Sequence, residues 1–159
     1  MTITNGYATL TQLKSVDVLN FDSGTTHDAT LELIIEGVSR SIDKECGRFF
    51  YTTSSQSRYY TAKKDNKLSV TDISSTSGLS IATDDNGDGT YENTWSSTDY
   101  NLAPYNASLD GDPYEFIETA PAGVYRFPVL VPRGVKVTAT FGYAAVPKPI
   151  SDACILQST

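Results

Sequence analysis

A long helical repeat limits what this chain can fold into. From Asp28 to Cys46 the apolar side chains recur every three or four residues, at Leu31, Ile34, Ile35, Val38, Ile42 and Cys46. This spacing predicts one amphipathic helix whose apolar face packs on other elements. The charged side chains, with Ser39, fall on the opposite, polar side. Nineteen residues at 1.5 Å each give a helix of roughly 28 Å.

Local signals mark the ends of this helix. Asp28 suits its first turn, and Gly47 suits a left-handed C-terminal cap. Glu36 and Arg40 are four residues apart, in the order that favours an ion pair on a helix surface.

After Gly47 the hydrophobic period changes to that of strands. Gly, Asn, Asp and Pro separate the strand-like segments SRYYTA, KLSVTDIS, GLSIATDD, TYENTW, DYNLAP, YEFIET and VKVTATFGY. The last is the clearest, because Val135, Val137, Ala139 and Phe141 alternate with polar residues. The pattern predicts an antiparallel β barrel or sandwich.

Helical segments are expected at both ends of the chain. Residues 7–20 form a first helix, which Thr9 or Thr11 caps, and Pro149 begins a last helix. The fold class is therefore α+β, with a small helical bundle from the terminal helices and an inserted β unit. We expect N-terminal helices in 1–50, the β unit in 51–145 and the C-terminal helix in 146–159, in one composite domain. The pattern stops at Thr159 without a cap, so we expect the natural chain to continue.

Composition excludes some classes of protein. The net charge is −7 with 39% hydrophobic residues, which is typical of a folded domain and argues against binding nucleic acid through basic contacts. No apolar run approaches the ~20 residues of a membrane helix, and the first residues lack a signal-peptide pattern. Cys46 and Cys154 lie among apolar neighbours and are expected to be reduced core residues, although a disulfide stays open.

The segment DDNGDGTYENTW, residues 84–95, begins as a calcium-binding EF-hand loop does. Its twelfth position is Trp95 instead of the required acid, and its flanks have strand character. Asn-Gly and Asp-Gly are also strong hairpin signals. We therefore expect a hairpin that needs no metal; weak calcium capture by its acids is the alternative.

No catalytic constellation is visible in the sequence. The single histidine, His27, lies in a Ser/Thr-rich loop, and neither a nucleophile elbow nor a phosphate-binding loop is present. We expect no enzyme activity and no cofactor. The ten tyrosines and six phenylalanines are expected to fill the β core and its cross-strand pairs. The alternative function is a β-rich tail or cell-surface module that binds carbohydrate through such rings.

The order of several segments resembles a known family. These are YATLTQLK, LELIIEGVSRSIDKECGRFFY, RYYTA, DDNGDGTYENTW, DYNLAPYNA, PYEFIE and VKVTATFGYAAVPKPISDACILQ, which span most of the chain. Together they resemble the head-to-tail connector, or adaptor, proteins of long-tailed bacteriophages. The most specific parts are SRSIDKECGRFFY and FGYAAVPKPISDAC.

The resemblance implies a structural virion protein of the neck, assembled in the host cytoplasm. Family members form a ring, commonly of twelve copies, that joins the portal protein to the stopper or tail-completion protein. Genomic DNA passes through the ring and is ejected through it without specific binding, and no membrane is involved. The residues expected to contact neighbouring copies or partners are Glu36, Arg40, Lys44 and Arg133.

Overall fold

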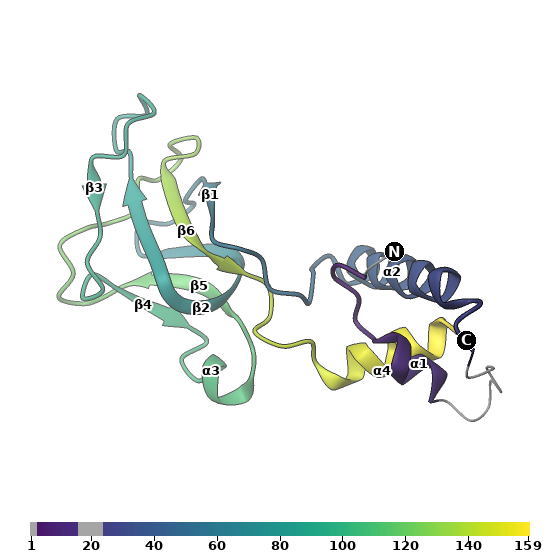
Figure 1. Cartoon of the computed structure of the whole chain (residues 1–159). Helices are drawn as coiled ribbons and strands as arrows, with labels where there is room; N and C mark the ends of the chain where they lie inside the picture. Colours follow the sequence, from purple (N-terminus) through teal and green to yellow (C-terminus); the bar gives the residue numbers. More distant parts are fainter. Residues whose placement is uncertain (1–2, 16–23) are drawn as a thin grey trace. The chain divides into compact units, whose positions relative to one another are not determined.

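The computed structural model describes residues 3–15 and 24–159, and the chain divides into two compact units (Figure 1). One unit is helical and comprises residues 1–51 and 145–159; the other comprises residues 52–144 and carries the β-sheet. The α+β class is therefore confirmed. The helices of the first unit are α1 (Leu10–Lys14), α2 (Asp28–Cys46) and α4 (Lys148–Gln157).

Helix α1 begins with a reciprocal cap. The Thr9 hydroxyl accepts a hydrogen bond from the Gln12 backbone N–H, and the Gln12 side chain accepts one from the Thr9 N–H. This satisfies two backbone donors at the N-terminus and confirms Thr9 as the cap. The expected helix over 7–20 begins only at Leu10, and its part from residue 16 lies outside the described residues.

Helix α2 has the bounds that its sequence predicts, and Gly47 follows it with φ of 64°. Its buried face differs from the expected one, because Leu31, Ile35, Ser39 and Ile42 form it. Ile34 is 38% exposed and Cys46 is exposed, so the prediction that both belong to the core was wrong. The buried row follows steps of four, four and three residues, which keeps one narrow line of the helix against its neighbours.

Helix α4 packs against α2 within the helical unit. Pro149 lies in its first turn, as expected, and Cys154 is fully buried against α2. A proline suits this position because the first N–H groups of a helix have no intrahelical partner.

The second unit is built on a six-stranded antiparallel sheet. Its strands are β1 (Gln56–Tyr60), β2 (Lys67–Thr83), β3 (Asn93–Thr94), β4 (Tyr100–Ala103), β5 (Tyr114–Thr119) and β6 (Val135–Phe141). The strand order is β1-β6-β2-β5-β4, and β3 pairs with the end of β2. The described sheet thus ends at β1 and β4 and is not closed, so it is not a barrel, which was one of the two arrangements expected from the sequence.

Strand β2 replaces two of the predicted strands. The segments KLSVTDIS and GLSIATDD are parts of one long strand, which is strongly curved (Figure 1). Its first residues pair with β5 and its last with β3 and β6, with register shifts between Ser69 and Ser80. Such irregularities bend a strand, so one strand can belong to two parts of the sheet.

Strand β6 lies at the centre of the core. Val135, Val137, Ala139 and Phe141 are fully buried, which confirms the predicted alternation. The predicted segment TYENTW contributes only the two residues of β3, and the short helix α3 (Ala107–Asp110) was not predicted. None of the helices in the described ranges is long and apolar enough to span a membrane.

Candidate functional site

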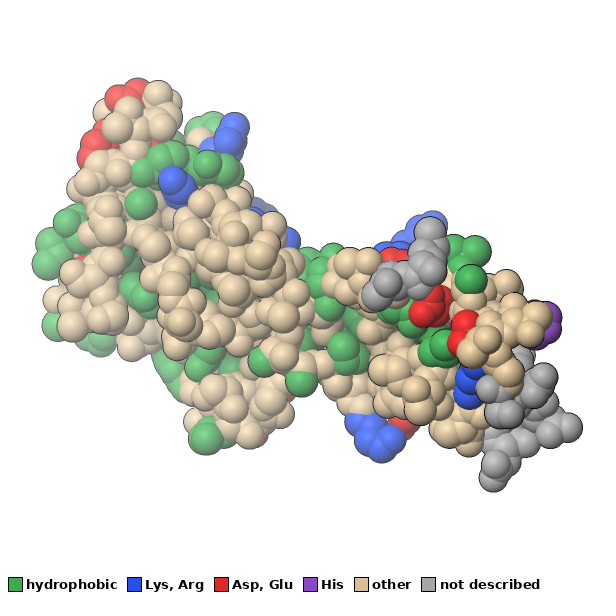
Figure 2. Space-filling view, viewed as in Figure 1, with side chains coloured by type: hydrophobic (Ala, Val, Ile, Leu, Met, Phe, Trp, Pro, Cys, Tyr) green, Lys and Arg blue, Asp and Glu red, His purple; other side chains and the backbone are tan. Residues whose placement is uncertain are grey.

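The loop of residues 84–92 joins β2 to β3, and we call it the acidic loop. Ala82 pairs with Thr94 and Thr83 with Asn93 in antiparallel register, so the segment is a hairpin, as predicted. Figure 2 shows acidic side chains gathered at the tip of this loop. Asp85, Asp88 and Glu92 are exposed there.

Asp84 holds the acidic loop from the inside. Its side chain is buried, and its two carboxylate oxygens accept hydrogen bonds from the backbone N–H groups of Gly87 at 2.7 Å and Gly89 at 2.8 Å. Both glycines have positive φ, 77° and 91°, a region that β-branched side chains avoid. The hydrogen bonds of Asp84 and the positive φ of the two glycines together account for the conformation of the turn.

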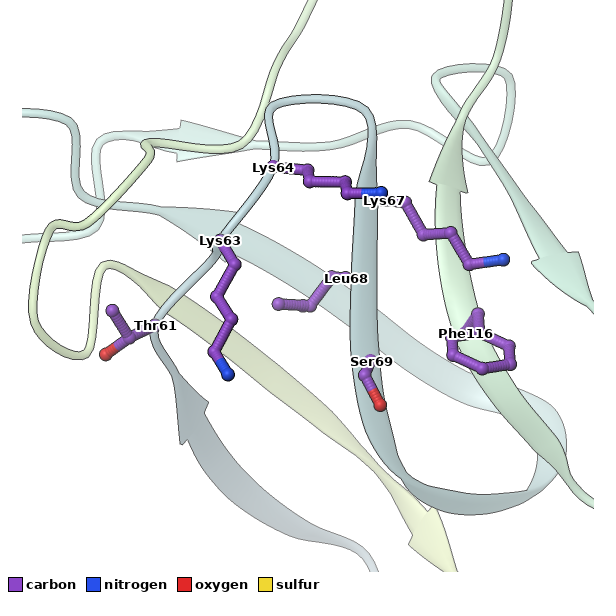
Figure 3. A pocket seen from close by; sticks show the side chains of 7 residues that line it. All are labelled: Thr61, Lys63, Lys64, Lys67, Leu68, Ser69 and Phe116. Carbon is purple, nitrogen blue, oxygen red and sulfur yellow. The ribbon is translucent and has the colours of Figure 1, made fainter.

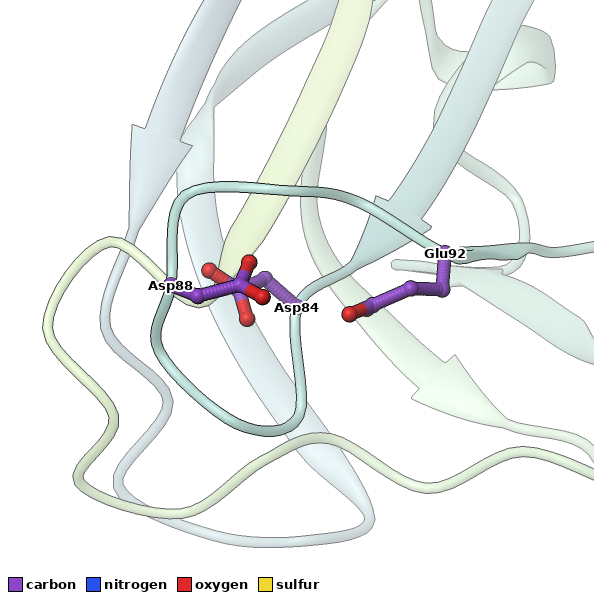
Figure 4. Close-up of side chains that lie close together, drawn as sticks. All are labelled: Asp84, Asp88 and Glu92. Carbon is purple, nitrogen blue, oxygen red and sulfur yellow. The ribbon is translucent and has the colours of Figure 1, made fainter.

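Three carboxylates converge inside the loop. Oxygens of Asp84, Asp88 and Glu92 lie within 4.8 Å of one another (Figure 4). The Thr90 backbone N–H, and to a smaller extent the Thr90 hydroxyl, donate hydrogen bonds to the Asp88 carboxylate. These bonds hold the pKa of Asp88 below its ordinary value. The sequence-based prediction considered the twelfth position of the segment 84–95 and did not single out Glu92 at the ninth. These three side chains could hold a cation, while metal independence remains a prediction.

A basic pocket lies between the β1–β2 turn and β5 (Figure 3). Lys63, Lys64 and Lys67 line a cavity of about 300 Å³ together with Leu68 and Phe116, and we call it the lysine pocket. The Lys67 ammonium lies 2.8 Å from a Glu118 carboxylate oxygen and 4.1 Å from the centre of the Phe116 ring. The hydrogen bond from Lys67 lowers the pKa of Glu118.

The predicted interface residues on α2 have different surroundings. Arg40 lies against its own helical unit: its guanidinium carbon is 4.9 Å from the ring centre of Tyr51, and its Nε is 3.1 Å from Asp43. The expected Glu36–Arg40 pair is therefore replaced by a pair with Asp43, because Arg40 turns towards the aromatic rings. Glu36 is half-buried and Lys44 is exposed. Their role in an interface stays a prediction.

Arg133 belongs to the sheet unit and lies in a turn beside the acidic loop. It has a positive φ of 57°, its guanidinium lies 4.6 Å from the Tyr59 ring centre, and its carbonyl accepts a hydrogen bond from the Tyr91 hydroxyl. The ring contact positions the side chain, and the hydrogen bond holds the backbone, next to the acidic loop. Its role in an interface is likewise untested.

The aromatic residues divide between core and surface. Trp95 is 5% exposed and stacks on Phe127 with ring centres 4.6 Å apart, so both rings belong to the core, which for Phe127 was expected. Tyr59 and Tyr105 are 43% and 69% exposed. The Tyr59 and Tyr91 rings form a tilted surface pair 5.8 Å apart.

No family model matches the chain, and no curated protein matches it. Among solved structures, it is similar to a chain of the "Neck of empty GTA particle computed with C6 symmetry", where GTA denotes a phage-like gene transfer agent. The match has a TM-score of 0.61 at 16% identity and covers 99% of this chain and 79% of that chain. At this identity the likeness establishes a shared fold.

Proposed function

We propose that this chain is a structural protein of the neck of a phage-like particle, where it forms an adaptor ring. The ring joins the portal vertex of the capsid to the stopper or tail-completion protein and surrounds the passage of the genome. The observation that carries this proposal is the fold match, which extends over 99% of the chain, both units included, to a chain of a particle neck. The ordered sequence segments that resemble connector proteins support it independently.

The symmetry of the matched particle neck supports a ring. That structure was computed with C6 symmetry, and twelve copies, the number expected from the sequence resemblance, also satisfy a sixfold axis. Closed rings of identical subunits use heterologous contacts, in which one surface of each copy meets a different surface of the next. We therefore expect each copy to carry two complementary surfaces.

The charge of the chain suits a passage for DNA. Each copy carries a net charge of −7, and a ring concentrates that charge around its axis. Acidic walls repel phosphates, so DNA can move through without being held. We propose no enzymatic step and no cofactor in this role.

Electron microscopy of particles carrying the chain tests this proposal. A labelled variant should place the density between the portal and the tail, with copies related by an axis through the neck. The matched control is an unlabelled particle at the same stage of assembly. Density on the capsid shell or at the tail tip would contradict the proposed function, as would glycan-dependent attachment of the chain to cell surfaces.

A further inference from the structure

The lysine pocket offers cations that the chain itself does not use. Lys63 and Lys64 are exposed, and neither forms an ion pair with an acid in residues 3–15 or 24–159. Lys67, by contrast, is paired with Glu118. The pocket combines this unpaired charge with an apolar floor at Leu68, which is 3% exposed. Such a surface suits a partner that brings carboxylates on a protein loop.

The acidic loop has the opposite character. Asp85, Asp88 and Glu92 are exposed, and in the part of the chain that the structure describes none of them pairs with a lysine or arginine. Asp88 and Glu92 crowd their oxygens against those of Asp84. Like charges at this distance repel, and a neighbouring ammonium group would relieve the repulsion.

One segment separates these two surfaces within a copy. Residues 129–134 are hydrogen-bonded to the turn that carries the lysines. The Leu130 N–H donates to the Ala62 carbonyl at 2.9 Å. On its other side the Gly134 carbonyl accepts from the Asp84 N–H at 2.8 Å. The chain therefore holds its basic and acidic surfaces apart, and each is open to another molecule.

We propose that the lysine pocket of one copy binds the acidic loop of the neighbouring copy. The inference rests on the proposed ring, and it names the two surfaces that a heterologous contact requires. Lys63 and Lys64 would lie against Asp85, Asp88 and Glu92 of the next copy. Charge complementarity favours a second copy as the partner, because one chain carries both the basic and the acidic surface, with a comparable number of charges on each. Copies with a net charge of −7 otherwise repel one another, so this contact would offset that repulsion.

A charge swap tests this contact. In one variant Lys63→Glu and Lys64→Glu make both surfaces acidic; in the other Asp85→Lys and Glu92→Lys make both basic. Asp84 and Asp88 are left unchanged because their carboxylates bind backbone N–H groups of the loop. Full chains labelled with ¹⁴N and ¹⁵N are mixed at high concentration and low salt. A carbodiimide then couples touching amines and carboxylates, and mass spectrometry identifies peptides that join two copies.

The wild-type chain should give mixed-isotope links between the lysine turn and the acidic loop. Each variant alone should lose them, and an equal mixture of the two variants should restore links between unlike chains. Raising the salt to about 0.5 M should reduce all of these links, since the Debye length falls well below 10 Å. The matched control, Asp110→Lys with Asp112→Lys, reverses two exposed acids at the end of α3 and just beyond it, and should keep the wild-type links.

Absence of wild-type links, or their persistence in either single variant, would overturn the proposed contact. Links to a different surface, or to added DNA alone, would overturn it too. None of these results bears on the location of the chain in the particle. Failure of this contact is therefore distinguishable from failure of the neck assignment, which microscopy decides.

Discussion

The Ser39 hydroxyl oxygen lies 3.5 Å from the Cys154 sulfur, and both side chains are fully buried where α4 meets α2. The same hydroxyl donates to the Ile35 carbonyl at 2.7 Å and accepts the Tyr7 backbone N–H at 3.0 Å. One small polar side chain thus connects the chain before α1, helix α2 and helix α4. The assignment of Ser39 to the polar side of α2 was wrong, because these hydrogen bonds satisfy a hydroxyl inside the core.

Replacing Ser39 by alanine should therefore destabilise the helical unit. The change leaves the buried Tyr7 N–H without its acceptor, which costs about 1–3 kcal/mol. Urea unfolding followed by circular dichroism measures the loss. Ser41→Ala, an exposed position on the same helix, is the control and should change stability little. Equal stabilities of the two variants would contradict the role given to the Ser39 hydroxyl.

Two adjacent isoleucines on α2 should respond differently to truncation. Ile35 is fully buried, so Ile35→Ala should cost about 2–5 kcal/mol through lost burial and the cavity left behind. Ile34 is 38% exposed, and Ile34→Ala should cost at most about 1 kcal/mol. Denaturant midpoints of the two variants give the comparison directly. The opposite ranking would mean that another face of the helix lies against α4.

Where the sequence predicted well, the signal was local. The bounds of α2 and the alternation in β6 follow from side-chain periods that each element carries in itself. Which row of α2 faces inwards depends also on Tyr7 and Cys154, which lie 32 and 115 residues away from Ser39 in the sequence. The spacing of apolar side chains within α2 does not contain information about these distant contacts.

The candidate sites show the same difference between features set by local sequence and features set by contacts distant in the chain. The hairpin at the acidic loop could be predicted, because Asn-Gly and Asp-Gly act within a few residues. The lysine pocket could not, since its wall includes Phe116 from β5, far along the chain from Lys63. Glu92 was not predicted because only the acid required at the twelfth position was considered, although the ninth position is also a ligand position of EF-hand loops. The hairpin brings this ninth position back beside the first, Asp84.

Calcium should leave the thermal stability of the chain nearly unchanged. Backbone hydrogen bonds to Asp84 and the pairing of β2 with β3 account for the loop conformation without an ion. A structural ion would add about 2.7 kcal/mol at a hundredfold excess over its Kd. Melting temperatures in millimolar calcium and in chelator should therefore agree. A large calcium-dependent rise that Asp88→Asn abolishes would show that the clustered acids are ligands.

The contribution of Asp99 should disappear in acid. Its carboxylate accepts the N–H of Val124 at 3.0 Å and that of Ser96 at 2.8 Å, and these bonds hold its pKa below the ordinary value of 3.8. A depressed folded-state pKa stabilises the protein above the unfolded pKa, and this stabilisation is lost as pH falls through the folded value. Wild type should therefore exceed Asp99→Asn in stability at pH 7, and the two should converge as the pH falls below 3.8 and through the lower pKa of the folded state. A pH-independent difference in urea midpoints would contradict this account.

The two cysteines should differ sharply in reactivity. Cys46 is exposed at the end of α2, whereas Cys154 is fully buried against Ser39, so the thiols lie in different environments and both are free. This corrects the expectation of two core cysteines, and the reason is that the buried row of α2 ends at Ile42. An aromatic disulfide reagent should therefore titrate one thiol in the native protein at once and the second only on unfolding. Cys46→Ser should abolish the fast reaction and leave stability almost unchanged, since the position is exposed. Fast reaction of two thiols in the native chain would show that the packing of α4 on α2 is not as described, and the absence of a fast reaction would show that Cys46 is not exposed.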